Sequence, residues 1–363
     1  MKPYYQRGPV TLLCADVREG LASLPDESVQ CIVTSPPYWG LRDYGVPGQI
    51  GLEPTLAEYI SGMVDVFGAC RRVLRRDGTL WLNVGDTYHN PQTNGGVGRN
   101  STINSTRTHA AFREGQRAAR IGRNPKAGQE HADVAEAPQR VRQAGLKPKD
   151  LCGVPWRLAL ALQDDGWYLR SDIVWHKPNS MPESVKDRPT KAHEYVFLLA
   201  RGPRYFYDAA AISERATYRE PNAPDKIRSP HGQGFTRRAR RGKNEHSGHQ
   251  RYAGFNDRWA QRETRAMARN ARSVWSIATQ PRRENHFAAF PDELAGRCIR
   301  AGSPWGGAVF DPFAGRGTTL IVAAQLGRSA IGIELSPKYC SFAAIALDDV
   351  LLPLIDGAAE ASR

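Results

Sequence analysis

The sequence is poor in cysteine, and the six cysteines among its 363 residues are dispersed without a single Cys-x-x-Cys pair. This spacing argues against a zinc knuckle or a disulfide framework and favours a reducing compartment. The chain also has no apolar run of membrane-spanning length and no signal-peptide core near its N-terminus. We therefore expect a soluble, cytoplasmic protein.

Net positive charge is confined to two segments of the chain. Residues 87–150 contain 11 Lys or Arg against 5 Asp or Glu, and residues 201–284 contain 19 against 8. The whole chain carries a formal charge of +13, so the remaining residues carry −4. The second segment also interleaves aromatic side chains with its bases. That combination is typical of nucleic-acid binding, and a solvated basic loop is the alternative.

Short apolar runs alternate with helical patterns, which predicts an α/β fold with a seven-stranded, mostly parallel sheet and helices on both faces. The expected strands are Thr11–Ala15, Val29–Thr34, Thr79–Val84, Tyr168–Trp175, Glu194–Ala200, Ala308–Asp311 and Ser329–Ile333. The expected helices are Thr55–Leu74, Pro155–Asp164, Asp292–Ala301, Thr318–Leu326 and Pro337–Val350.

One strand–helix–strand unit carries a glycine turn and a terminal acid. The stretch VFDPFAGRGTTLIVAAQLGRSAIGIEL runs from Val309 to Leu335. Gly315 and Gly317 allow the backbone to bring N–H groups close to a ligand at a helix N-terminus. Glu334 ends the next strand, where a carboxylate can accept hydrogen bonds from a ribose diol.

The same unit lacks the features of two phosphate-binding motifs. Leu320 stands where the dinucleotide fingerprint has its third glycine, and the chain contains no Gly-Lys-Ser/Thr sequence of a P-loop. Asp311 places a carboxylate where a pyrophosphate would be repelled and a cationic ligand attracted. These residues favour S-adenosylmethionine (SAM), which carries an amino group, over a nucleotide phosphate.

A second unusual stretch is TSPPYWGLRDYG, from Thr34 to Gly45. It follows an apolar run, and two consecutive prolines cannot extend a sheet ladder, because each lacks an N–H and has a fixed φ. The prolines therefore end the strand abruptly and hold Tyr38 and Trp39 on a stiff path. A turn whose aromatic residues simply pack on the core is the alternative interpretation.

Together these motifs resemble the amino-group DNA methyltransferases. SPPY at 35–38 and DPFAGRGT at 311–318 match the family's catalytic and cofactor motifs, and their order is similar to that of the β group. RSDIVWHKPNSMP at 170–182, HFAAFPDELA at 286–295 and the N-terminal LLCADVREGLASLPDESVQCIVTSPPY also resemble family segments. The resemblance covers about 1–86, 151–200 and 285–352 and leaves out the two basic segments.

The resemblance implies a Rossmann-like SAM-dependent methyltransferase fold that is circularly permuted and carries a basic DNA-recognition insertion. The implied parts are a target-base half at 1–202 with a basic loop at about 87–150, a target-recognition region at 203–284 and a SAM-binding half at 285–363. The residues expected to bind S-adenosyl-L-methionine are Asp16, Phe290, Asp311, Pro312, Phe313, Gly315, Gly317, Thr318, Thr319, Glu334 and Leu335.

The family resemblance also implies a partner and a source. The expected substrate is double-stranded DNA, and the expected origin is bacterial, archaeal or phage. A cognate restriction endonuclease is the partner that the family suggests, with a solitary enzyme as the alternative. The oligomeric state and the DNA recognition sequence stay open.

The expected catalytic residues are Ser35, Pro36, Pro37 and Tyr38. The exocyclic amine of a base is a poor nucleophile, because its lone pair is delocalised into the ring. The Ser35 hydroxyl and the Pro36 carbonyl can accept the amine hydrogens and align the nitrogen, and Tyr38 can stack on a base swung out of the duplex. The residues expected to contact the target base or DNA are Trp39, His176, Lys177, Arg237, Arg238, Arg240 and Arg241.

Serine at the first motif position favours cytosine N4 as the methylated amine, with adenine N6 as the alternative. Methylation at carbon 5 of cytosine needs a Pro-Cys nucleophile, and no cysteine here follows a proline. Two other classes stay open. One is a protein-glutamine methyltransferase, which normally has Asn first and the opposite motif order, and the other is a DNA-binding module with a degenerate cofactor site.

Overall fold

The computed structural model describes residues 1–41, 43–89, 146–215, 268–280 and 290–361. The chain divides into two compact units, residues 1–208 with 272–363 and residues 209–271. In the smaller unit, β7 (Glu214–Arg215) and β8 (Ala268–Arg269) form a two-stranded antiparallel ladder. The target-recognition region expected at 203–284 lies mostly outside the described residues and stays a prediction.

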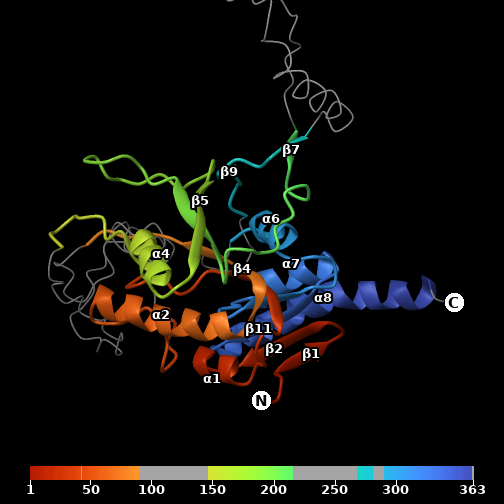
Figure 1. Ribbon diagram of the computed structural model, residues 1–363. Coiled ribbons are helices and arrows are strands. Elements are labelled where there is room, and N and C mark those ends of the chain that lie inside the picture. The colour runs from red at the N-terminus through yellow and green to blue at the C-terminus, as the bar shows by residue number, and fades with distance from the viewer. Residues whose placement is uncertain (42, 90–145, 216–267, 281–289, 362–363) are drawn as a thin grey trace, which may run out of the picture. The chain divides into compact units, whose positions relative to one another are not determined.

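A nine-stranded mixed sheet forms the centre of the larger unit, in the order β1-β2-β11-β10-β3-β4-β6-β5-β9 (Figure 1). All seven expected strands are confirmed: β2 (Val10–Cys14), β3 (Val29–Thr34), β4 (Leu74–Val84), β5 (Tyr168–His176), β6 (His193–Ala200), β10 (Ala308–Asp311) and β11 (Ser329–Glu334). The expected number of seven is too low, because β1 (Tyr5–Arg7) and β9 (Val274–Ser276) add one strand at each edge. Each has three residues, too few for a periodic pattern to be recognised.

The five expected helices are also confirmed, and a sixth was not expected. They are α2 (Leu56–Val73), α4 (Val154–Asp164), α6 (Asp292–Gly302), α7 (Thr318–Gln325) and α8 (Pro337–Ala361), which continues past its expected end. The additional helix is α1 (Val17–Ala22), whose N-cap Asp16 accepts a hydrogen bond from the Arg18 N–H at 2.8 Å. Within the described residues, no helix is long and apolar enough to cross a membrane.

The helices cover both faces of the sheet. Ile32 and Leu80 lie in the core cluster that α2 shares with the sheet, and α2 also contacts α1 and α4. Cys31, Thr79 and Trp81 occupy the alternate positions, and all three lie against the end of α6, which contacts α7. Because successive side chains of a strand point to opposite faces, α2 and α6 cover opposite faces. All six residues of β3 are therefore buried.

The strand directions bring many segment ends to one edge of the sheet. The strands β2, β11, β10, β3 and β4 run parallel to one another, so all five end at this edge. The strand β6 runs antiparallel to β4, and β5 runs antiparallel to β6, so β6 begins and β5 ends there too. Ligands of open α/β sheets bind at such a carboxyl edge.

The packing of α6 on the sheet depends on Gly302. A Cβ at this position would lie 2.5 Å from Trp81 Nε1, 2.6 Å from Thr79 Oγ1 and 2.7 Å from Cys31 Sγ, all in the buried interior. We therefore expect Gly302→Ala to lower the free energy of unfolding by about 1–3 kcal/mol, because it overpacks the helix–sheet contact. Urea unfolding followed by circular dichroism measures this change.

A matched control is Gly62→Ala in the interior of α2. A Cβ there would meet only Arg18 Nη2, at 4.0 Å. Since alanine is the better helix former, this variant should raise the free energy of unfolding by about 0.5–1 kcal/mol. If both substitutions moved the unfolding midpoint in the same direction, the close packing at Gly302 would not be the cause.

Candidate active site

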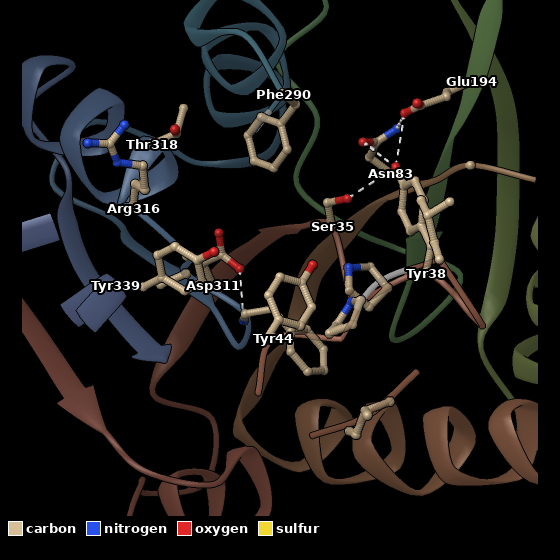
Figure 2. Close-up of a pocket in the computed structure, with 18 of the residues that line it drawn as sticks. Ser35, Tyr38, Tyr44, Asn83, Glu194, Phe290, Asp311, Arg316, Thr318 and Tyr339 are labelled. Atoms are coloured by element: carbon tan, nitrogen blue, oxygen red, sulfur yellow. Dashed lines mark hydrogen bonds between the residues drawn. The ribbon is translucent and has the colours of Figure 1, made fainter. Parts of the chain in front are cut away.

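A cavity of about 790 Å³ opens at the carboxyl edge of the sheet. It is lined by segments from both ends of the chain, and Figure 2 shows the two motif regions on its opposite sides. The expected site residues that line it are Asp16, Ser35, Pro36, Pro37, Tyr38, Lys177, Phe290, Asp311, Pro312, Phe313, Gly315, Thr318, Glu334 and Leu335. Residues that lie far apart in the sequence therefore share one cavity.

Two residues expected to contact the target base do not line this cavity. Trp39 is only 2% exposed and packs in the core, where its indole N–H donates to the Glu53 carbonyl at 2.9 Å. His176 ends β5 beside the edge strand β9, and its Nδ1 lies 3.0 Å from Ser276 Oγ. The expectation for Trp39 is corrected, because its side chain packs in the core. His176 is half-buried beside β9, and its contact with the target base or DNA stays a prediction. The expected DNA contacts Arg237, Arg238, Arg240 and Arg241 lie outside the described residues.

Two residues of the glycine-turn motif support the cavity without lining it. Gly317 caps α7 with a positive φ of 80°, and a Cβ there would lie 3.3 Å from Ala343 Cβ. Thr319 is 1% exposed, and its hydroxyl lies 2.7 Å from Asp311 Oδ2 and 3.2 Å from the Val33 carbonyl oxygen. Contact of either residue with the cofactor stays a prediction. They shape the backbone and hold Asp311.

The Asp311 carboxylate is buried at the end of β10 and is almost fully hydrogen-bonded. Its Oδ1 accepts from Thr34 Oγ1 at 2.6 Å and from the Phe313 N–H at 3.0 Å, and its Oδ2 accepts from Thr319. Burial raises its pKa to about 6 despite these three donors, which lower it. The carboxylate is therefore rigid, and an added positive charge at the cavity would stabilise its ionised form.

Glu334 ends β11 and holds two backbone segments together. Its Oε2 accepts from the Gly315 N–H at 2.9 Å, and its Oε1 accepts from the Ser336 N–H at 2.8 Å. Burial raises its pKa to about 7, against these backbone hydrogen bonds. The carboxylate thus ties the glycine turn to the start of α8 and still lines the cavity.

The N-terminus of α7 presents an unsatisfied donor to the cavity. Thr318 is the first residue of this helix and is 4% exposed, and its Oγ1 has no hydrogen-bond partner. A Cβ at Gly315 would meet only the Phe313 carbonyl oxygen, at 4.0 Å, so this turn leaves room beside the helix end. A buried hydroxyl without a partner is costly, and a helix N-terminus favours negative charge. This corner of the cavity is suited to a carboxylate.

The SPPY turn is held rigidly on the other side of the cavity. The Tyr59 hydroxyl of α2 donates to the Pro37 carbonyl at 2.9 Å. A Cβ at Gly85 would lie 2.5 Å from Cε2 of Tyr38, so the tyrosine ring lies directly on the backbone that follows β4. The prolines, the buried Tyr59 and this close contact together fix the position of Ser35 and Tyr38.

The hydroxyl of Tyr38 enters a polar network that the sequence analysis did not identify. It donates to Glu194 Oε2 at 2.9 Å, and the Asn83 Nδ2 donates to the same oxygen at 3.2 Å. Lys177 Nζ pairs with Glu194 Oε1. Ser35 Oγ lies 3.4 Å from the Tyr38 hydroxyl, and Figure 2 shows this chain of contacts.

Several other cavity residues were not predicted from the sequence. Tyr44, in the loop after SPPY, and Tyr339, at the start of α8, make an edge-to-face contact with ring centroids 6.1 Å apart (Figure 2). Arg316 stands between the two glycines of the turn and lies over the Phe342 ring, with 5.0 Å from its Cζ to the centroid. Arg316 and Tyr44 had a signal in the sequence, since both lie inside the stretches singled out there, whereas Tyr339 had none. Among the described residues, no group of three or more His, Cys, Asp or Glu could hold a metal ion.

The sequence matches a known family over most of its length. The DNA methylase family model (N6_N4_Mtase) matches residues 29–345. The type II methyltransferase M.SmaI of Serratia marcescens is 42% identical over 332 residues, which cover 92% of this chain and 88% of that protein. The type II methyltransferase M.Cfr9I of Citrobacter freundii is 41% identical over 333 residues, covering 92% and 86%.

Solved structures with the same fold include two DNA methylases. The PvuII DNA methyltransferase (cytosine-N4-specific) superposes with a TM-score of 0.52 at 18% identity, covering 94% of this chain and 88% of that one. A putative DNA modification methylase of Thermus thermophilus, TTHA0409, complexed with S-adenosyl-L-methionine, superposes with a TM-score of 0.50 at 21% identity and 93% coverage of both chains. The expected α/β methyltransferase fold is confirmed.

The raised pKa of Glu334 predicts a pH-dependent stability. The folded protein holds this proton up to about pH 7, whereas an unfolded glutamate releases it near pH 4.3. The Glu334 contribution is therefore fully present at low pH and is lost as the pH rises from about 4.5 to 7. Glu334→Gln cannot ionise. Between pH 4.5 and 7, the free energy of unfolding of this variant should therefore rise by about 2–3 kcal/mol relative to that of the unsubstituted protein.

Urea unfolding at a series of pH values measures this difference. Asp311 titrates in both proteins, so its contribution largely cancels when the two curves are subtracted. A difference that stayed constant from pH 4.5 to 7.5 would mean that the Glu334 carboxyl titrates as it does in the unfolded chain.

Proposed function

Because this chain belongs to the DNA methylase family, we propose that it is a type II DNA methyltransferase that methylates the N4 amine of a cytosine swung out of duplex DNA. S-adenosyl-L-methionine is the proposed methyl donor. One observation carries the proposal: Ser35 of the SPPY turn and the carboxylates of Asp311 and Glu334 line one cavity. A methyl donor held by the carboxylates can therefore meet a base amine held by the turn.

The α7 side of the cavity fits the chemical groups of SAM. Glu334 can accept from the ribose diol, and Asp16, which lines the same cavity, is proposed to contact the adenine. Asp311 favours the cationic amino group, and the unsatisfied Thr318 hydroxyl at the end of α7 can donate to the carboxylate. Phe290 covers this side of the cavity in Figure 2. When bound, SAM supplies an electrophilic methyl group on a sulfonium.

The SPPY turn orients the amine. Ser35 Oγ and the Pro36 carbonyl can accept its two hydrogens, which moves the nitrogen lone pair out of the ring system and toward the methyl donor. Tyr59 engages the Pro37 carbonyl, so the turn is braced from α2 and does not have to be ordered during reaction. Positioning of this kind supplies up to roughly 7–11 kcal/mol in favourable cases.

The ring of Tyr38 is the proposed stacking surface for the base. It lies on Gly85 with its hydroxyl anchored in the Glu194 network, so one face is supported by backbone. Lys177, whose ammonium pairs with Glu194, lines the same region. Serine as the first motif residue favours cytosine N4. Adenine N6 remains the alternative target for the same machinery.

The strand order supports a circularly permuted arrangement of the fold. The last strands of the chain, β10 and β11, lie in the centre of the sheet between β2 and β3. In this arrangement the chain begins on the target-base half and supplies the SAM-binding half last. The basic arginines at 237–241 are proposed to contact DNA phosphates.

The first prediction of this proposal concerns the product. After incubation of unmethylated genomic DNA with the protein and SAM, nucleoside mass spectrometry should detect N4-methylcytosine. Ser35→Ala should reduce turnover about 100-fold, because an amine acceptor is lost, while calorimetric SAM affinity stays unchanged. Asp311→Asn should instead weaken SAM binding. N6-methyladenine as the product would contradict the base assignment and leave the proposed cofactor site intact.

A second prediction separates the role of Thr318 from simple packing. Thr318→Val removes the unsatisfied hydroxyl and keeps the side-chain shape. The ligand-free variant should therefore unfold at a higher temperature, because its free energy of unfolding rises by about 1–3 kcal/mol. Its SAM affinity should fall about 10-fold, as expected for one lost hydrogen bond to a charged group.

The two changes have opposite signs, so a general loss of structure cannot produce both. Thermal unfolding and titration calorimetry measure them on the same sample. If Thr318→Val bound SAM as tightly as the unsubstituted protein, the N-terminus of α7 would not hold the carboxylate of SAM.

A further inference from the structure

We propose that Glu194 fixes the hydrogen-bond direction of the Ser35 hydroxyl, so that Ser35 meets the target base only as an acceptor. Glu194 acts through Tyr38 and is therefore a positioning residue. The inference rests on the proposed function, because it assigns a role in holding the base amine. It explains why the Ser35 hydroxyl, which could donate or accept a hydrogen bond, only accepts one from the target base.

The first step is the state of Glu194. Burial alone would raise its pKa, but the Lys177 ammonium and the hydrogen bonds from Lys177, Tyr38 and Asn83 outweigh this and lower the pKa. Glu194 is therefore ionised near neutral pH, and an ionised carboxylate can only accept hydrogen bonds. Oε1 accepts from Lys177, and Oε2 accepts from Asn83 and Tyr38.

The second step is the single proton of the Tyr38 hydroxyl. Burial raises the pKa of this phenol well above its ordinary value, so the hydroxyl keeps its proton. Glu194 Oε2, at 2.9 Å, is its nearest acceptor, whereas Asn83 Oδ1 lies at 3.4 Å. With its proton directed to Glu194, the Tyr38 oxygen can only accept from Ser35.

The third step follows at Ser35. Among the described residues, the hydrogen-bond partner of Ser35 Oγ is the Tyr38 hydroxyl, 3.4 Å away. This contact is long, as catalytic hydrogen bonds often are before substrate binds. The Ser35 proton points to Tyr38, and its lone pairs face the cavity that Ser35 lines. A base amine can donate to these lone pairs, whereas the carbonyl at carbon 4 of thymine would meet an acceptor.

The strand directions explain why these residues meet. Glu194 is the second residue of β6, and Asn83 lies near the end of β4, to which β6 is antiparallel. Lys177 follows the end of β5, which is antiparallel to β6. The three side chains therefore meet beside the SPPY turn. Figure 2 shows Asn83 and Glu194 on the side of Ser35 opposite Asp311.

The test is Glu194→Gln, which keeps the shape of the side chain and reverses the direction of its hydrogen bond with Tyr38. Lys177 must still be given an acceptor, so the amide oxygen of the glutamine should face it. The amide NH2 then faces Tyr38 and donates to its oxygen, so the Tyr38 proton turns to one of its remaining acceptors, Ser35 Oγ or Asn83 Oδ1, each 3.4 Å away. When Tyr38 donates to Ser35, the serine presents its proton to the base. We expect kcat for cytosine methylation to fall about 100-fold, with unchanged SAM affinity.

A second variant should rescue the first. In Lys177→Met with Glu194→Gln, the ammonium no longer holds the amide oxygen. The amide can then turn its oxygen toward Tyr38 and Asn83, which both donate to that position in the unsubstituted protein. We expect kcat of the double variant to return to within about 10-fold of the unsubstituted enzyme. Only kcat is compared, because loss of a lysine–DNA contact would alter KM.

Tyr38→Phe provides an independent measurement. It keeps the stacking ring but removes the hydroxyl through which Glu194 acts on Ser35, so kcat should fall about 10-fold. Adding Glu194→Gln to Tyr38→Phe should then reduce kcat little further. The matched control is Asp348→Asn. Asp348 also accepts from a tyrosine and pairs with an arginine, with Tyr5 Oη at 2.8 Å and Arg7 Nη1 at 2.7 Å, but it does not line the cavity. This variant should leave kcat unchanged.

The outcomes separate the inference from the proposed function. If the unsubstituted protein forms no methylated nucleoside, the proposed function fails and the inference falls with it. If it is active and Glu194→Gln stays within threefold of it, or the double variant is no faster than Glu194→Gln, only the inference is overturned. Should Glu194→Gln fail to fold, an unchanged kcat of Tyr38→Phe overturns it instead.

Discussion

The hydrogen bond between Thr34 and Asp311 is the contact on which the rest of the site depends. It joins the last residue of β3 to the last residue of β10 at 2.6 Å, across 277 positions of sequence. Ser35 begins the SPPY turn directly after Thr34, and the glycine turn begins directly after Asp311. The relative position of the two motifs is therefore set by one buried contact, reinforced from α7 by Thr319.

The antiparallel strand β6 brings a further set of side chains to the carboxyl edge of the sheet. A sheet of parallel strands alone would present only carboxyl ends at this edge. Because β6 runs the other way, it brings its first residues there, and Glu194 is the residue that reaches Tyr38. The SPPY turn is thus held from three directions, by Thr34 below, by α2 through Tyr59, and by the polar network of β6.

Most of the fold followed from the sequence, because its periodic patterns are long enough to be recognised. The seven longer strands and five helices were predicted, and the motifs at 35–38 and 311–318 were assigned to catalysis and to cofactor binding. Glu194 was recognised only as the start of a strand, since its role depends on strand direction and on a partner 156 positions away. Trp39 was misplaced because a tryptophan beside a reactive turn can face either the cavity or the core, and only packing decides between them.

The pKa values of the carboxyl groups on the two sides of the cavity are shifted in opposite directions. Glu194 has a permanent cationic partner in Lys177, and the pKa of its carboxyl is lowered. No ion pair is formed by Asp311 or Glu334 among the described residues, and burial raises their pKa values to about 6 and about 7. A cationic ligand would relieve this unfavourable burial, because its charge stabilises the ionised forms. The proposed donor carries two positive charges, one on its amino group and one on the sulfonium, and only the sulfonium charge is lost when the methyl group leaves. The amino group that Asp311 is proposed to attract stays charged in the product, so the same carboxylate would favour both donor and product.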